Sequence, residues 1–157
     1  MAIDPTATPR ITENDVTLTV PRSWHTRRNP GHGIVLAARP PTVPVSGISP
    51  EIVVRCGVVD VGLRSWRGRA LLDLRAQLAD FALEDADEFD LGDRRVAYCR
   101  FAHRFGVADV LCDQWAWLVD ALGVTLTCTV AREDYPTYCD LFEDVAATVA
   151  VLPRLAS

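Results

Sequence analysis

Residues 94–130, RRVAYCRFAHRFGVADVLCDQWAWLVDALGVTLTCTV, predict three consecutive β-strands. The last is the most regular, because apolar residues alternate with threonines from Val124 to Val130, which gives one apolar face and one hydroxyl face. The middle strand, about residues 109–119, is apolar on both faces, as is typical of a strand that is covered on both sides. Short connections at 106–108 and 120–123 favour an antiparallel meander.

The rest of the chain adds further strands and two helices. Residues 1–13 are expected to form a flexible arm and residues 14–153 a single domain. Strands are predicted at about 15–20, 34–38 and 51–61, and loops at 25–33, 39–50 and the acidic run 84–90. Apolar periodicity predicts helices over about 65–83 and 135–152. In the first helix Trp66, Ala70 and Leu74 belong to the apolar stripe, and Arg67 and Asp73 are expected on the opposite side. The predicted fold class is therefore α+β, a central antiparallel sheet of about six strands covered by two main helices in an α/β/α sandwich.

Composition narrows the range of functions. The 157 residues carry a net charge of -5, which argues against a nucleic-acid partner. All 16 basic residues are arginines, so the chemistry of a Schiff-base lysine or a P-loop lysine is excluded. The sequence contains neither a signal-peptide pattern nor an apolar stretch of about 18 residues. We therefore expect a cytoplasmic protein that binds no membrane.

The five cysteines are expected to be free thiols. Cys56, Cys99, Cys112 and Cys128 lie in predicted strands, and Cys139 lies in a predicted helix. None belongs to a C-x-x-C pair, and no ligands are clustered at the spacing of a zinc site. We therefore predict buried, reduced cysteines, with neither a metal nor another cofactor.

Three local features and their order resemble a known family. The features are VPRSW at 20–24, PEIVVRCGVVD at 50–60 after a proline-rich loop, and CDQWAWLVDALGVTLTCTVAREDYPTYCDLFEDVAATV at 112–149 after a long helix. Over about residues 14–152 the chain resembles the PsbP-like superfamily, and most closely its small actinobacterial LpqN-type domains. The resemblance implies a central antiparallel sheet with helices on both sides. It also implies a binding role, since the superfamily includes a photosystem subunit, a Ran-binding protein, lipoproteins and effector chaperones. Residues 1–16 show no lipidation signal, so the lipidated N-terminus of the lipoprotein members is not expected in this chain.

Two histidine groups admit a functional and a structural interpretation. The loop HTRRNPGHG at 25–33 combines His25 and His32 with two arginines, which would suit an anion site, but no helix N-terminus follows it and an exposed turn is the simpler interpretation. His103 could pair with Cys99 or Cys112 as a nucleophile and base, oriented by Asp113. Four residues along a strand span about 13 Å, too far for a bond between Cys99 and His103, so a structural histidine is favoured.

The candidate partner-binding surface centres on two tryptophans of the middle strand. Trp115 and Trp117 share one strand face and would anchor a partner helix or peptide if that face were open. The proline-rich loop 39–50 is expected to close over the partner with its apolar residues Val43, Val45 and Ile48. Arg100 and Arg104 are expected to meet acidic groups at the rim. The alternative is that the second helix already covers both tryptophans.

The function predicted from these features is non-catalytic binding of a protein or peptide. No catalytic motif is found, so no catalytic residue is assigned. A carrier of a small apolar ligand and an enzyme of unknown chemistry are the alternatives. A carrier requires a closed apolar cavity, whereas an enzyme requires polar groups with shifted pKa values that converge in one pocket. A homodimer is the alternative to a foreign partner.

Overall fold

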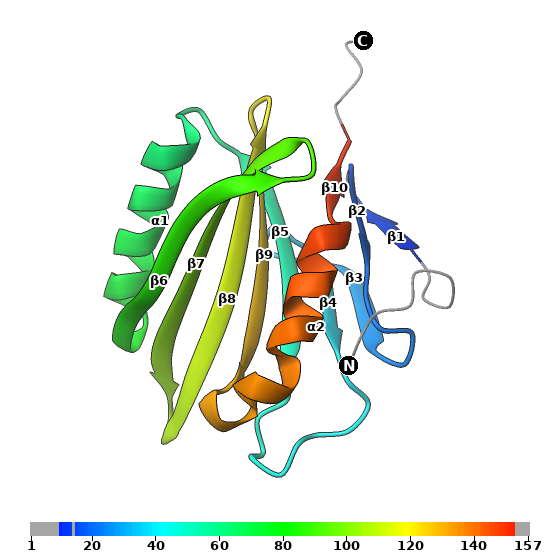
Figure 1. Cartoon of the computed structure of the whole chain (residues 1–157), viewed down its shortest axis with the longest axis vertical. Helices are drawn as coiled ribbons and strands as arrows, with labels where there is room; N and C mark the ends of the chain where they lie inside the picture. The colour runs from blue at the N-terminus through cyan, green and yellow to red at the C-terminus, as the bar shows by residue number, and fades with distance from the viewer. Residues whose placement is uncertain (1–9, 14, 153–157) are drawn as a thin grey trace.

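A seven-stranded antiparallel sheet forms the centre of the molecule (Figure 1). The computed structural model describes residues 10–13 and 15–152. The strand order is β3-β4-β5-β9-β8-β7-β6, and every neighbouring pair is antiparallel. The strands are β3 His25–Gly31, β4 Ile34–Arg39, β5 Glu51–Val58, β6 Ala79–Leu91, β7 Arg94–Phe105, β8 Ala108–Val119 and β9 Leu122–Ala131. The predicted meander is confirmed as the hairpins β7-β8 and β8-β9.

Two helices and a second, smaller sheet complete the fold. The helices are α1 Leu63–Gln77 and α2 Tyr135–Thr148, and a short 3-10 turn, η1 Arg132–Asp134, precedes α2. The smaller sheet has the order β1-β2-β10, formed by Arg10–Glu13, Val16–Thr19 and Ala150–Val151. The α+β class is confirmed. The main sheet has seven strands because β3 and β6 join it, while the predicted strand at 15–20 belongs to the smaller sheet instead.

The main core lies on the sheet face beneath α2 and the smaller sheet. Alternate residues of β8 and β9 point to this side, and they pack with Leu141, Phe142 and Val145 of α2. The backbone N–H of Thr19 donates to Thr148 Oγ1 at 2.9 Å, which ties β2 to the end of α2. This face is therefore covered by α2 and the smaller sheet together.

The opposite sheet face is covered far less completely. A small buried cluster of Cys99, Phe101, Val110 and Cys112 packs against half-buried leucines of α1. No residue of α1 is itself buried, whereas α2 buries four residues. In Figure 1, α1 lies beside β6 and β7, away from β3 and β4. Part of this sheet face is consequently left without a helix.

The acidic run at 84–90 is a strand, not the predicted loop. Helix α1 ends at Gln77, and β6 continues from Ala79 to Leu91 as the edge of the sheet. Arginines of the neighbouring strand neutralise part of its charge: Arg100 pairs with Glu84 at 3.6 Å, and Arg95 pairs with Glu88 at 3.1 Å. Acidic residues disfavour strands in isolation, but these cross-strand ion pairs favour this pairing.

Three further predicted boundaries differ from the structure. The predicted loop at 25–33 contains edge strand β3, which pairs with β4 and has a register shift between Arg28 and Gly31. Of the predicted N-terminal arm, residues 1–9 lie outside the described residues, while Arg10–Glu13 forms β1 and pairs with β2. The second helix ends at Thr148, and β10 follows it.

The five cysteines are free thiols and lie in the predicted strands and helix. Cys99, Cys112 and Cys128 are buried, whereas Cys56 and Cys139 are half-buried. Within residues 10–13 and 15–152, no helix is long and apolar enough to cross a membrane.

Candidate functional site

Trp115 and Trp117 do not line an open groove. Their exposed fractions are only 3% and 2%, and both belong to the core cluster that includes Phe142 and Val145 of α2. The Tyr98 ring packs on Trp115 with the ring centroids 5.2 Å apart. The predicted partner-binding role of both tryptophans is therefore wrong, because α2 already occupies the face that a partner would need.

The other residues of the predicted binding surface lie elsewhere. Arg100 and Arg104 do meet acidic groups, but these belong to the chain itself: Glu84 for Arg100, and Asp80 and Asp109 for Arg104. In the proline-rich loop, Val43 and Val45 are exposed and Ile48 is half-buried. Ser46 Oγ donates to Asp134 Oδ2 at 2.5 Å, so the loop is attached to η1. Arg100 lines a cavity that Trp115 also lines, whereas Arg104 and the loop residues are not part of that lining.

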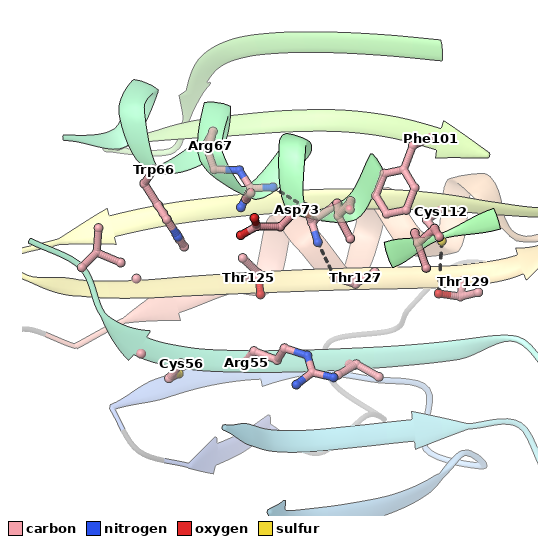
Figure 2. Close-up of a pocket in the computed structure, with 18 of the residues that line it drawn as sticks. Arg55, Cys56, Trp66, Arg67, Asp73, Phe101, Cys112, Thr125, Thr127 and Thr129 are labelled. Atoms are coloured by element: carbon pink, nitrogen blue, oxygen red, sulfur yellow. Dashed lines mark hydrogen bonds between the residues drawn. The ribbon is translucent and has the colours of Figure 1, made fainter. Parts of the chain in front are cut away.

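A cleft of about 540 Å³ lies on the opposite sheet face, between α1 and strands β5, β9 and β8. Figure 2 shows Trp66, Arg67 and Asp73 projecting from α1 towards these strands. One part of the lining is apolar: Val53, Val58, Val59, Trp66, Ala70, Leu74, Leu78 and Phe101. The other part is polar: Glu51, Arg55, Arg67, Asp73, His103, Gln114, Thr125, Thr127 and Thr129. This mixed cleft is the candidate functional site.

A glycine allows α1 to approach the sheet at one end of the cleft. A Cβ atom at Gly123 would lie 2.9 Å from the Trp66 ring and 2.5 Å from Val59 Cγ2. Both distances are shorter than a van der Waals contact, so a side chain at this position would displace the indole. The Trp66 ring therefore lies directly on the backbone of β9 and closes this end of the cleft.

The floor of the cleft is the hydroxyl face predicted for β9. Thr125, Thr127 and Thr129 are each half-buried and line the cleft, whereas Leu126 and Cys128 of the same strand are buried in the main core. The alternation predicted from the sequence is confirmed. The floor thus offers three hydroxyl groups, each of which can donate and accept a hydrogen bond.

A chain of hydrogen bonds crosses the cleft from α1 to β9 (Figure 2). Arg67 Nη2 donates to Gln114 Oε1, and Gln114 Nε2 donates to Thr127 Oγ1 at 2.9 Å. Gln114 is 9% exposed, and both ends of its amide are occupied by these two bonds. Its orientation is therefore fixed, and it holds one edge of the Arg67 guanidinium.

The charge of Arg67 is not balanced by a carboxylate. The side chain is half-buried and makes no ion pair within the described chain. Burial lowers the pKa of Arg67, although the neighbouring Cys99 opposes this shift. Burial also raises the pKa of the Cys99 thiol, so at neutral pH it is a neutral neighbour. The guanidinium remains charged, since arginine does not lose its proton in proteins.

The predicted cysteine–histidine alternatives are not assembled. Asp113 lies on the α2 face of β8, opposite Cys99, His103 and Cys112, so it cannot orient His103. Within the described residues no hydrogen bond joins His103 to either cysteine, and His103 Nδ1 is buried without a partner. Burial raises the pKa of Cys112 to about 12, which keeps this thiol protonated and poorly nucleophilic. No group of three or more metal-ligating side chains occurs in the part of the chain that the structure describes.

A second cavity, of about 550 Å³, lies on the other face between α2 and strands β6–β8. Two tyrosines of its lining, Tyr98 and Tyr135, donate hydrogen bonds to the carboxylate of Asp113 in β8, at 2.5 Å from Tyr98 Oη and 2.9 Å from Tyr135 Oη. Asp113 is only 1% exposed. The Arg100 guanidinium lies 5.8 Å from the centre of the Tyr135 ring. Tyr135 is the first residue of α2, so this network fixes the start of that helix on the sheet.

Arg67 and Gln114 are the site residues that the sequence did not indicate. Periodicity placed Arg67 on the solvent side of the first helix, opposite the stripe of Trp66, Ala70 and Leu74. The stripe does face the sheet as predicted, but Arg67 reaches the sheet beside it because α1 lies at the side of the sheet. The available signal was the threonine face of β9, which has no reason to be polar beneath a fully packed helix.

Solved structures with the same fold confirm the architecture. No protein-family model matches the chain, and no curated protein matches it significantly. LpqN of Mycobacterium tuberculosis, described as involved in cell envelope biogenesis, is 13% identical with a TM-score of 0.74, covering 93% of this chain and 91% of its own. The cyanobacterial PsbP of Synechocystis sp. PCC 6803 is 14% identical with a TM-score of 0.70, covering 96% of each chain. The Saccharomyces cerevisiae Ran-binding protein Mog1p is 11% identical with a TM-score of 0.63, covering 93% of this chain and 96% of its own. At these identities the likenesses show the PsbP/Mog1-like fold alone.

Proposed function

We propose that the protein is a non-catalytic binding module that takes an extended segment of a partner protein in the cleft between α1 and β5, β9 and β8. The observation that carries this proposal is the composition of the cleft, about 540 Å³ with an apolar wall from α1 and a hydroxyl floor from β9. Exposed residues such as Arg55, Val58 and Asp73 line it as well, so the cleft opens to solvent.

This lining, part apolar and part polar, suits a peptide better than a ligand that is wholly apolar or wholly polar. An extended peptide presents backbone N–H and C=O groups, which threonine hydroxyls can satisfy, and alternating side chains, which the indole and leucines can accommodate. Further support comes from Mog1p, a protein of the same fold that binds another protein, Ran. The proposed compartment is the cytoplasm, where the five thiols would stay reduced.

The enzyme and carrier alternatives are less well supported. An enzyme of the acyl-transfer type needs a nucleophile within reach of a base, and the cleft offers a protonated Cys112 that contacts Thr129 Oγ1 at 3.5 Å instead. A carrier of an apolar ligand needs an enclosed apolar cavity, and this cleft has a polar floor. Both comparisons favour a binder.

Filling the cleft tests the proposal. The probe is the set of peptides obtained by selecting a displayed library of random 12-residue peptides on the immobilised protein. Ala70 lines the cleft, and Leu72 is 68% exposed on the same helix without lining it. We expect Ala70→Trp to weaken the selected peptides at least about tenfold in fluorescence anisotropy, because its indole occupies the space of the ligand. The matched control Leu72→Trp should leave their affinity unchanged.

Two results would contradict the proposal. One is a library that yields no peptide binding above background. The other is a set of peptides that bind Ala70→Trp as tightly as the wild type while that variant keeps its melting temperature. If the chain instead forms a homodimer through a surface other than the cleft, sedimentation would show a dimer, and Ala70→Trp would leave that dimer intact.

A further inference from the structure

We propose that Arg67 is the anchor of the cleft and binds an acidic side chain, Asp or Glu, of the partner segment. This inference rests on the proposed function and goes beyond it by naming the chemistry that the cleft selects. It starts from a cation that is half-buried in the wall of the cleft and that forms no ion pair within the described chain, although Asp73 and Glu51 also line the cleft.

The arginines at the rim of the sheet show what Arg67 lacks. Arg95, Arg100, Arg104 and Arg132 each lie within 4.0 Å of a carboxylate oxygen of the chain. Arg67 is half-buried, and its neighbours are the neutral Gln114 amide, the neutral Cys99 thiol and the Trp66 ring, whose centre lies 5.2 Å from the guanidinium carbon. Removing a charge from water without a counter-charge is costly, so an incoming carboxylate would regain that energy.

The guanidinium is also held in position for a planar ligand. Gln114 Oε1 accepts a hydrogen bond from Arg67 Nη2, and Gln114 Nε2 donates one to Thr127 Oγ1. These two bonds restrict the positions that the guanidinium can take in the cleft. A guanidinium has five N–H donors, and the bond to Gln114 uses one of them. Donors that neither Gln114 nor the neighbouring Cys99 engages can form the fork that matches the two oxygens of a carboxylate. Thr127 and Thr125 offer hydroxyl groups to the adjoining backbone.

The location of Arg67 favours a side chain over a chain terminus. Arg67 is hydrogen-bonded to Gln114, which in turn is hydrogen-bonded to Thr127, the middle threonine of the floor. The lining of the cleft continues on both sides of this point, to Trp66 and Gly123 in one direction and to Leu78 and Thr129 in the other. A segment that runs along β9 would therefore pass Arg67 instead of ending there. An acidic residue within the segment is the group that reaches the guanidinium.

Paired peptides and paired variants test the anchor. The probes are the selected peptides, acetylated and amidated at their ends so that only side chains carry charge, each made in an acidic version and in one with Glu→Gln or Asp→Asn at the most frequent acidic position. We expect the wild type to prefer the acidic version at least about tenfold. Arg67→Gln should bind both versions equally. The matched control Arg69→Gln, which removes an exposed charge from the same helix, should keep the preference.

The outcomes separate the anchor from the proposed function. If the peptides lose affinity for Ala70→Trp but contain no acidic residue, or if Arg67→Gln keeps the acidic preference, the anchor is overturned and the peptide-binding function stands. If Ala70→Trp binds all peptides normally, the proposed function fails and the anchor fails with it. Should Arg67→Gln fold poorly, the comparison of the two peptide versions on the wild type still decides. If the wild type binds both versions equally, the anchor is overturned.

Discussion

The carboxylate of Asp113 is the most enclosed charge in the described chain, and its pKa links it to folding. Burial raises this pKa above the ordinary value of 3.8, and the hydrogen bonds from Tyr98 and Tyr135 only partly oppose the shift. A raised folded-state pKa means that the folded protein binds the proton more tightly than the unfolded chain. The contribution of Asp113 to stability is therefore greatest below pH 3.8 and is lost as the pH rises through the folded-state pKa.

Replacing Asp113 by Asn tests this sign. The free energy of unfolding of the wild type, measured by urea denaturation relative to Asp113→Asn, should fall as the pH rises from about 4 towards neutrality and then become constant. The matched control is Asp93→Asn in the exposed turn between β6 and β7, which changes the same atoms outside the network. A difference that grows with pH would mean that the two phenols stabilise the carboxylate more than burial destabilises it.

Single residues also mark where sequence reasoning stops. Alternation assigned Thr125, Thr127 and Leu126 to the correct faces of β9, because a strand turns each successive side chain to the opposite face. The same reasoning predicted Trp115 as an anchor for a foreign partner, which is wrong, because alternation shows that a face is apolar but not that the chain's own α2 covers it. Arg67 was assigned to the wrong side, since a helix at the side of a sheet can extend a long polar side chain beneath itself.

Among the elements, β6 is the long strand that the sequence pattern did not predict. Its 13 residues form the exposed edge of the main sheet, and their burial pattern shows no buried position. An alternating apolar pattern is the usual signal of a strand. It is absent here because acidic residues on both faces of β6 pair with arginines of β7: Glu84 with Arg100 on the α2 face, and Glu88 with Arg95 on the α1 face. The ion pairs depend on the partner strand, so they could not be predicted from β6 alone.

The charge of β6 has a second consequence, which a paired variant can test. An open edge strand can pair with another molecule, and charged side chains oppose that pairing. We expect Asp85→Val with Asp87→Val, both exposed on β6, to promote self-association, measured as a concentration-dependent increase in sedimentation coefficient. The control, Asp60→Val with Asp93→Val, removes the same charge at exposed positions outside the strands and should stay at the wild-type value. Equal association in both pairs would show that net charge, not the edge, prevents aggregation.

Across the whole molecule, the two faces of the sheet differ in how firmly they are covered. The α2 face is covered by a helix with four buried residues and by the smaller sheet, and a cavity remains between α2 and β6–β8. On the other face α1 buries none of its residues and leaves the cleft above β5, β9 and β8. The fold class and the meander could be predicted because they follow from local alternation. The cleft could not, because it results from the lateral position of α1, which is set by packing between distant segments such as Trp66 and Gly123.

This asymmetry predicts two different free energies of opening. Cys112 and Cys99 lie beneath α1 and are 2% and 5% exposed, whereas Cys128 lies in the main core and is fully buried. Local opening requires less free energy where few apolar contacts are lost. The test is alkylation at increasing urea concentrations, with mass spectrometry as the readout. We expect Cys99 and Cys112 to react through a local opening whose free energy depends only weakly on urea. Cys128 should react only through global unfolding, with the full urea dependence.

The rates are to be divided by those of the unfolded chain at the same pH, because burial raises the pKa of all three thiols and the thiolate is the reacting form. After that correction, a lower opening free energy at Cys99 and Cys112 than at Cys128 would mean that α1 separates from the sheet while α2 remains packed. Such a motion would widen the cleft without unfolding the core. Identical opening free energies and urea dependences at all three cysteines would contradict this, since they would mean that both faces open only together.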